Sequence, residues 1–188
     1  QSARLRRDHA DLAAEEQYHA IGNFFFEEMY GPRDFSSRDE QARRLRQFVN
    51  VVPGLSLRDV EPALALLELS NQLDDEVASQ LAALDAPLDF DEETYERAYY
   101  LADNYYQRVE QLDLVRTALY NVFRTANKPF IQLTLERTVG FAERVGMAEI
   151  HRFLRKGHEA IQSVRDIYRF VETVYVREKE RLDRIYNM

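Results

Sequence analysis

Apolar residues recur at intervals of three and four along almost the whole chain, a spacing typical of α-helices rather than strands. Little interrupts this pattern, because the 188 residues include only 6 Gly and 5 Pro. The helix-breaking residues that interrupt it fall at Gly31-Pro32, Pro53-Gly54, Ala86-Pro87, Lys128-Pro129 and Gly146. The pattern therefore predicts long helices joined by short links.

These breaks define the expected helices, which span about residues 2–30, 37–51, 56–84, 91–125 and 129–146, followed by one or two helices over 147–186. Capping patterns support the starts at Ser56 and Asp91, where acidic side chains lie in the first turn. Whether the last stretch is continuous across Asp166 stays open. Short links favour antiparallel neighbours. The predicted fold is an all-α, irregular antiparallel bundle of six or seven helices, forming a single helical domain over residues 1–188.

Composition narrows the classes of function. The formal net charge is −8, which opposes binding to DNA or RNA because such binding needs clustered Lys and Arg. The chain has no Cys, so disulfides and thiolate ligands are excluded. No apolar run approaches the roughly 18 residues of a membrane span. We therefore expect a cytoplasmic protein that binds neither nucleic acid nor membrane.

Several charged residues fall on the predicted apolar stripes. Asp113 and Arg116 interrupt the stripe of the 91–125 helix, Arg137 falls between Phe130 and Phe141, and Glu178 lies within the stripe of the last helix. One interpretation is a polar ligand site inside the bundle, since buried carboxylates often mark such sites. The other is a structural network of paired charges. The second interpretation is favoured, because buried charges must be paired wherever they occur.

A second candidate site is the corner that follows the run Phe24-Phe25-Phe26. Three consecutive Phe residues cannot all face one core, so one of them is expected to meet another helix or a ligand. Beyond this run, Tyr30 precedes a sharp turn. Two opposite-charge pairs follow the turn, formed from Arg33, Asp34, Arg38 and Asp39. The corner is either a binding surface or a junction locked by aromatic packing and salt bridges, and the junction is favoured.

One short motif resembles a metal site. Glu16 and His19 have the Glu-x-x-His spacing of carboxylate-bridged metal bundles, but such bundles use two copies and further Glu residues. Both residues are expected to project away from the local apolar stripe. His151 and His158 share a face but flank their stripe. Patterns for phosphate loops and nucleophilic serines are absent, and no cofactor is predicted.

The corner, together with the stretch 153–160 and Arg177-Glu178, resembles an uncharacterised family of bacterial all-helical proteins with no assigned activity. The resemblance covers most of the chain. It implies an all-helical fold and a bacterial, cytoplasmic setting, and it implies no catalytic residue.

The sequence favours a non-enzymatic function. The leading hypothesis is a helical interaction or small-ligand-binding domain, which contacts a second copy as a homodimer or another protein through the corner or the tyrosine-rich stretch 99–106. The alternative is a metal-dependent helical-bundle enzyme that uses a Glu16/His19 site together with remote acids such as Asp113 or Glu178.

Overall fold

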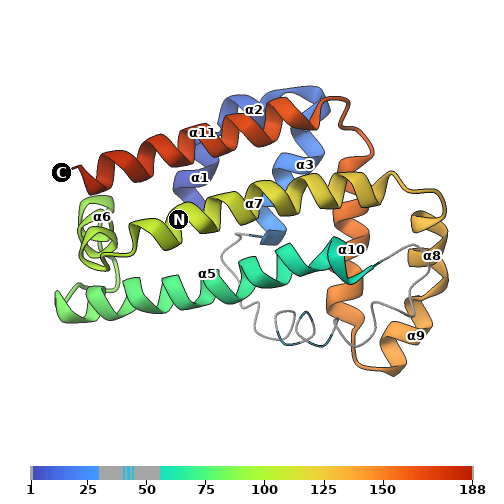
Figure 1. Ribbon diagram of the computed structural model, residues 1–188, viewed down its shortest axis with the longest axis horizontal. Coiled ribbons are helices and arrows are strands. Elements are labelled where there is room, and N and C mark those ends of the chain that lie inside the picture. The colour runs from blue at the N-terminus through green and yellow to red at the C-terminus, as the bar shows by residue number, and fades with distance from the viewer. Residues whose placement is uncertain (1, 30–39, 41, 43, 45–55, 188) are drawn as a thin grey trace. The chain divides into compact units, whose positions relative to one another are not determined.

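The structure is a computed structural model that describes every residue except 1, 30–39, 41, 43, 45–55 and 188 (Figure 1). Within these described residues the fold is all-α and contains no strand, as predicted. The α-helices are α1 (Ser2–Asp8), α2 (Ala10–Ala14), α3 (His19–Asn23), α5 (Leu57–Ala83), α6 (Glu92–Leu101), α7 (Tyr105–Ala126), α8 (Ile131–Arg137), α9 (Val139–Arg144), α10 (Ala148–Ile161) and α11 (Ile167–Tyr186).

The chain divides into two compact units. Unit 1 comprises residues 1–61 and 119–171, and unit 2 comprises residues 62–118 and 172–188. Three helices, α5, α7 and α11, contribute residues to both units. The prediction of a single domain over 1–188 stays a prediction.

The N-terminal segment of unit 1 is not the continuous helix that the sequence predicted. It breaks at His9 and again at Glu15, whose backbone is extended with ψ of 129°. A 3₁₀ turn, Glu16–Tyr18, and α3 follow the second break. The buried Tyr18 explains why this bend is retained, because its hydroxyl donates to the Asp166 carbonyl at 2.7 Å and its ring contacts Phe170.

The three consecutive Phe residues lie in a π-helical turn, Phe24–Met29. Phe25 and Phe26 are buried in the core. Phe24 instead packs against α10, where its ring lies 5.0 Å from that of Phe153. A Cβ added at Gly157 would come within 3.0 Å of the Phe24 ring, so this glycine permits the close approach. The expectation that one Phe meets another helix is confirmed.

In unit 2, the predicted helix over 91–125 is two helices, α6 and α7. Asp91 caps α6 by accepting a hydrogen bond from the Thr94 amide at 2.8 Å. The interruption falls at Asp103, which has a positive φ of 48°, and at the buried Asn104. Asp and Asn tolerate such backbone geometry better than most residues. The Asn104 side chain donates to Glu76 and accepts from the Tyr186 hydroxyl, which holds the break in place.

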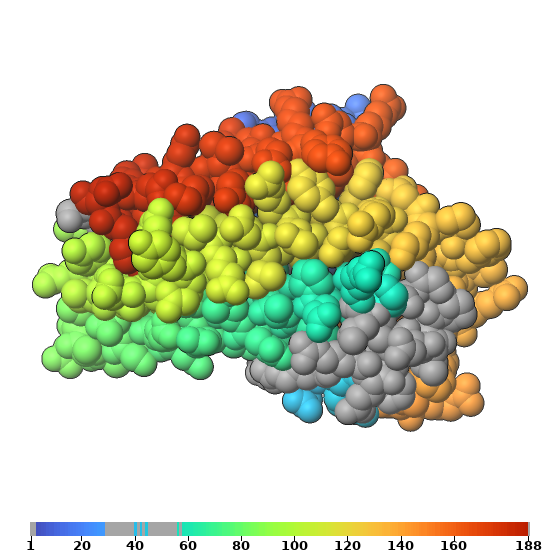
Figure 2. Space-filling view, viewed as in Figure 1, coloured from blue at the N-terminus to red at the C-terminus, as the bar shows by residue number. Residues whose placement is uncertain are grey.

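The core of unit 2 contains a buried cation. Arg108 on α7 is 1% exposed and donates to the Leu73 carbonyl on α5 at 2.8 Å. Its guanidinium also lies over the Tyr99 ring, 4.3 Å from the centroid, and donates to Gln111. Figure 2 shows side chains of α5 and α7 meeting along the visible face of this unit. The contact between α5 and α7 therefore includes a buried charged residue as well as apolar ones.

The second half of unit 1 contains α8, α9 and α10. Gly146 ends the predicted 129–146 segment with a φ of 69°, a conformation that favours glycine. Figure 1 shows α8 and α9 beside α10, and both contact it. Residues 162–166 separate α10 from α11, so the last two helices are distinct.

Candidate functional site

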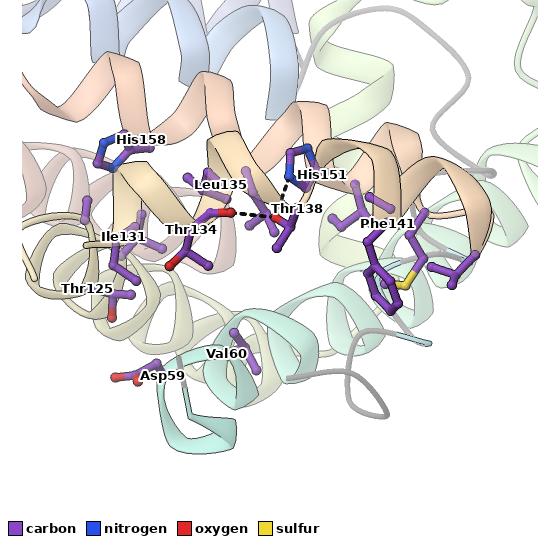
Figure 3. Close-up of a pocket in the computed structure, with 17 residues that line it drawn as sticks. Asp59, Val60, Thr125, Ile131, Thr134, Leu135, Thr138, Phe141, His151 and His158 are labelled. Atoms are coloured by element: carbon purple, nitrogen blue, oxygen red, sulfur yellow. Dashed lines mark hydrogen bonds between the residues drawn. The ribbon is translucent and has the colours of Figure 1, made fainter. Parts of the chain in front are cut away.

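A cavity of about 170 Å³ lies within unit 1 (Figure 3). Its wall is built from the first turn of α5, the end of α7, α8, α9 and α10, together with the links between them. Helical periodicity explains the wall, because residues three and four apart share a helix face. On α10 and its N-cap these positions are Met147, Ile150, Leu154 and His158.

The cavity lining is mainly apolar. The apolar lining residues are Val60, Val122, Ala126, Ile131, Leu135, Phe141, Ala142, Val145, Met147, Ile150 and Leu154, and the polar ones are Asp59, Thr125, Thr134, Thr138, His151 and His158. Val122 and Phe141 are also 38% and 42% exposed, respectively. Part of the lining is therefore accessible from the surface, which a ligand-binding cavity requires.

His151 and Thr138 form one polar contact on the cavity wall. Nε2 of His151 lies 3.1 Å from Oγ1 of Thr138, which in turn donates to the Thr134 carbonyl at 2.8 Å (Figure 3). Burial lowers the pKa of His151 below its usual value, so the ring is neutral at pH 7. Because the Thr138 proton is directed to a helix carbonyl, the pair lacks the proton arrangement of a nucleophile and its base.

Two other polar atoms on this wall are unsatisfied. Nδ1 of His158 and Oγ1 of Thr125 are shielded from solvent and have no hydrogen-bond partner in the part of the chain that the structure describes. The ring of His158 has a weak contact at its other nitrogen, where Nε2 of Gln162 lies at 3.4 Å. An unsatisfied buried polar group costs about 1–3 kcal/mol. Both atoms are buried, however, so a molecule that occupies the cavity does not reach them.

At the edge of the cavity, Asp59 closes the first turn of α5. Its carboxylate accepts hydrogen bonds from the amide and hydroxyl of Ser56 and from Lys128 Nζ at 2.8 Å, and it lies 3.8 Å from Arg124. Burial alone would raise the pKa of this carboxyl. The hydrogen bonds from Lys128 and Ser56 outweigh that effect and lower the pKa to about 2. The predicted cap at Ser56 thus also ties α5 to the α7–α8 link.

This pKa sets an expected pH dependence. Because the folded pKa lies below the unfolded value, the contribution of Asp59 is present above about pH 4 and is lost as the pH falls toward 2. We expect Asp59→Asn to lower the free energy of unfolding by about 1–2 kcal/mol at pH 6, allowing for the partly exposed Lys128. Urea titrations between pH 6 and 2.5 measure this difference.

The Asp59→Asn difference should fall to about a third of its pH 6 value by pH 2.5, because the folded carboxyl is only partly protonated there. Asp75→Asn, at an exposed position on the same helix, is the control and should cost less than about 0.5 kcal/mol throughout. A cost for Asp59→Asn that stays constant with pH would contradict the ion pair.

The corner residues Tyr30, Arg33, Asp34 and Arg38 lie outside the described residues. Their proposed binding role stays a prediction.

The charges expected inside the bundle are placed differently from the prediction. Asp113 and Arg137 are exposed, so their expected interior position is wrong. Arg116 donates to Glu172 at 2.8 Å, but its side chain is partly exposed. Glu178 is half-buried on α11. None of these residues lines the cavity, and a ligand-binding role for them stays a prediction.

Helical phase explains the error at Asp113. The predicted apolar stripe of the 91–125 helix assumes one continuous helix, but the break at Asp103 resets the helical phase. Tyr106 is consequently 83% exposed, while Arg108 takes the buried position. The prediction for Arg137 takes Phe130 as a residue that faces the core. Phe130 is 75% exposed, so it does not mark a core face.

The metal-like pair is exposed, as expected. Glu16 lies in the 3₁₀ turn and His19 begins α3, and both side chains point away from the local core. No group of three His, Cys, Asp or Glu side chains suited to a metal ion occurs within the described ranges. The structure therefore provides these two residues with no third ligand from that part of the chain.

The sequence pattern did not identify His151 and His158 as residues that line a cavity. Both were placed beside the apolar stripe of their helix rather than at its centre. The spacing of seven residues between them was a usable signal, because it places both rings on one face of α10. The face they share is the one that α8 and the end of α7 enclose as the cavity wall.

The fold and the cavity define an all-α protein with a small apolar site enclosed by helices. The chain belongs to the family described as Domain of unknown function (DUF8198), whose family model matches residues 1–188. Neither a curated protein nor a solved structure matched the chain. Among the described residues, no helix has both the length and the apolar composition needed to cross a bilayer.

Proposed function

We propose that this protein is a small-molecule-binding domain and that the cavity of unit 1 is its binding site. The observation that carries the proposal is a mainly apolar cavity of about 170 Å³ whose lining also includes a few polar side chains. Ligand sites are typically concave and mostly apolar, with a few polar groups that orient the ligand. This wall has that composition.

Energetics also favour an occupied cavity. The lining is mainly apolar and part of it is accessible from the surface, so water in the cavity meets apolar side chains. A bound molecule that displaces this water removes apolar surface from solvent, which is favourable at about 25 cal/mol per Å². Binding should therefore stabilise the fold.

The ligand is expected to be uncharged. None of the lining residues in the described ranges is Lys or Arg, so a ligand carboxylate or phosphate would lack a permanent counter-ion. Asp59 is the acidic residue of the wall, and its carboxylate already accepts hydrogen bonds from Lys128 and Ser56. A ligand cation would have to compete with these partners.

The test uses benzene, toluene and phenol with the full chain. At a concentration ten times Kd, a ligand should stabilise the protein by about 1.4 kcal/mol and raise Tm by about 3–6 °C. Differential scanning calorimetry measures the shift, and ¹H–¹⁵N spectra should show changes at amides of α8 and α10.

A cavity-filling variant provides the specificity control. Ala126→Leu adds volume at a lining position and should abolish binding while keeping or raising stability. Ala78→Leu makes the same change at an exposed position of α5 and should bind as the unmodified chain does. The proposal fails if none of the three compounds binds, or if Ala126→Leu binds them unchanged.

Self-association is part of the leading hypothesis from the sequence. Tyr106 and Tyr100 of unit 2 are exposed, which supports it, but they form no cavity. A homodimer, a bacterial source and a cytoplasmic location stay predictions. The Glu16/His19 enzyme has less support, since that pair lacks a third ligand among the described residues.

A further inference from the structure

We propose that unit 2 has a docking surface around α6 for a basic protein segment that also carries apolar side chains. Exposed hydrophobic residues at both ends of α6 and the negative charge of unit 2 support this inference. It goes beyond the proposed function, because it concerns a protein partner and a different part of the molecule from the cavity of unit 1.

Large hydrophobic side chains are exposed at both ends of α6. Leu88 is fully exposed and Phe90 is partly exposed in the link before the helix. Tyr100 and Leu101 are exposed in its last turn, and Tyr106 is exposed at the start of α7. Groups of exposed apolar side chains often mark interaction sites. We refer to these residues as the α6 surface: Leu88, Phe90, Tyr100, Leu101 and Tyr106.

Ring contacts connect the two ends of the α6 surface. Figure 1 shows α6 at the same end of unit 2 as the last turns of α5 and α11 and the first turn of α7. The 10 residues of α6 span about 15 Å, so a partner helix of about 14 residues reaches both of its ends. Ring centroids lie 5.4–6.3 Å apart along the series Phe90, Tyr95, Tyr99, Tyr186, Tyr105 and Tyr106.

The negative charge of the chain is concentrated in unit 2. Residues 62–118 and 172–188 contain 17 Asp and Glu but 7 Lys and Arg, whereas unit 1 contains 16 and 18, respectively. No Lys or Arg occurs between Arg58 and Arg97, a stretch that includes almost all of α5 and the first half of α6. The formal net charge of −8 therefore arises from unit 2.

Exposed carboxylates border the α6 surface. Asp89 lies between the two hydrophobic residues that precede α6, and Glu93 lies in the first turn of that helix. Glu110 follows Tyr106 by one turn of α7, so the two side chains share a helix face. Arg97 is an exposed cation of α6, but these acids outnumber it. The surroundings of the exposed hydrophobic residues are therefore acidic.

These two properties define the partner. Complementary charge attracts a partner that is basic, while the hydrophobic residues require apolar side chains to cover them. Nucleic acids and anionic membrane surfaces carry the same sign of charge as unit 2 and are repelled. A second copy that met the α6 surface with its own unit 2 would also bring like charges together. A basic segment with an apolar face avoids both penalties.

Three synthetic peptides of about 14 residues test the inference on the full chain. The first is an amphipathic helix with Leu at every third or fourth position and Lys elsewhere. The second replaces each Lys with Glu, and the third replaces each Leu with Ser. Isothermal titration calorimetry in about 50 mM NaCl should give the Leu/Lys peptide a Kd at least about ten-fold lower than either other peptide. Its binding should weaken in about 300 mM NaCl.

Variants of unit 2 locate the binding. The double variant Leu88→Ser, Tyr106→Ser should raise the Kd of the Leu/Lys peptide at least about five-fold, because it removes exposed apolar area. Asp89→Asn with Glu93→Gln should raise the Kd about three-fold at low salt. Tyr168→Ser is the matched control, since Tyr168 is an exposed tyrosine of unit 1, and it should leave the Kd unchanged.

Three outcomes would overturn the inference. The Leu/Lys peptide fails to bind more tightly than the other two, or the double variant, shown by circular dichroism to be folded, binds it unchanged. In the third, sedimentation without peptide shows a dimer that the double variant abolishes, so that the partner is a second copy. Binding of benzene or toluene by the double variant should equal that of the unmodified chain, so the cavity of unit 1 is tested separately.

Discussion

Replacing Arg108 with alanine is expected to lower the free energy of unfolding by about 3 kcal/mol. The side chain is buried, donates to the Leu73 carbonyl of α5 and stacks on Tyr99 of α6, so truncation removes both packing and hydrogen bonds. This is among the largest losses expected from any single substitution in unit 2. Chemical denaturation with urea, followed by circular dichroism, measures it.

Arg108→Met separates the volume of the side chain from its charge. Methionine retains most of the packing, and the nearest carboxylate, Asp74 at 3.6 Å, is itself more than half exposed and keeps its access to water. Replacing a buried ion by an apolar residue of similar size is often neutral. We therefore expect Arg108→Met to cost less than half as much as Arg108→Ala.

Arg97→Ala is the surface control for this pair of variants. Arg97 is exposed on α6, and its loss should change the free energy of unfolding by less than about 0.5 kcal/mol. An Arg108→Ala variant as stable as Arg97→Ala would show that Arg108 is not buried as described.

Tyr18→Ala is expected to have the largest effect in unit 1, about 3–5 kcal/mol. Tyr18 is fully buried, and its ring contacts Phe170 while its hydroxyl bonds to the Asp166 carbonyl. Removing the ring leaves a large void between the N-terminal segment and the start of α11. Thermal unfolding should show a reduction in Tm of at least about 6 °C.

The hydroxyl and the ring of Tyr18 can be tested apart. Tyr18→Phe retains the ring and should cost only about 1 kcal/mol, the value of one hydrogen bond. Tyr106→Ala removes an exposed tyrosine and should cost less than either Tyr18 variant. Equal losses for Tyr18→Ala and Tyr106→Ala would contradict the burial of Tyr18.

The helical fold could be predicted because helix formation leaves a local signal at every turn. Apolar spacing located α5, and the acids near Asp91 located the start of α6. The breaks at Glu15 and Asp103 carry weaker signals. Each is held by a distant partner, Tyr18 by Asp166 and Asn104 by Glu76, and such tertiary contacts have no local spacing to reveal them.

The cavity could not be predicted for a related reason. Periodicity shows which residues face inward, but it does not show whether the side chains of several helices fill the space between them. His158 illustrates the difference, since its position on α10 was known while its unsatisfied Nδ1 depends on what the other helices leave beside it.

The division into units has a consequence for how this protein can change in evolution. Each unit is assembled from two stretches of chain, 1–61 with 119–171 and 62–118 with 172–188, so the units alternate along the sequence. A single recombination crossover between residues 62 and 171 would interrupt at least one unit. Neither unit can therefore be exchanged as a contiguous cassette, and inheritance of the whole stretch, as in the family match over 1–188, is the arrangement that preserves both.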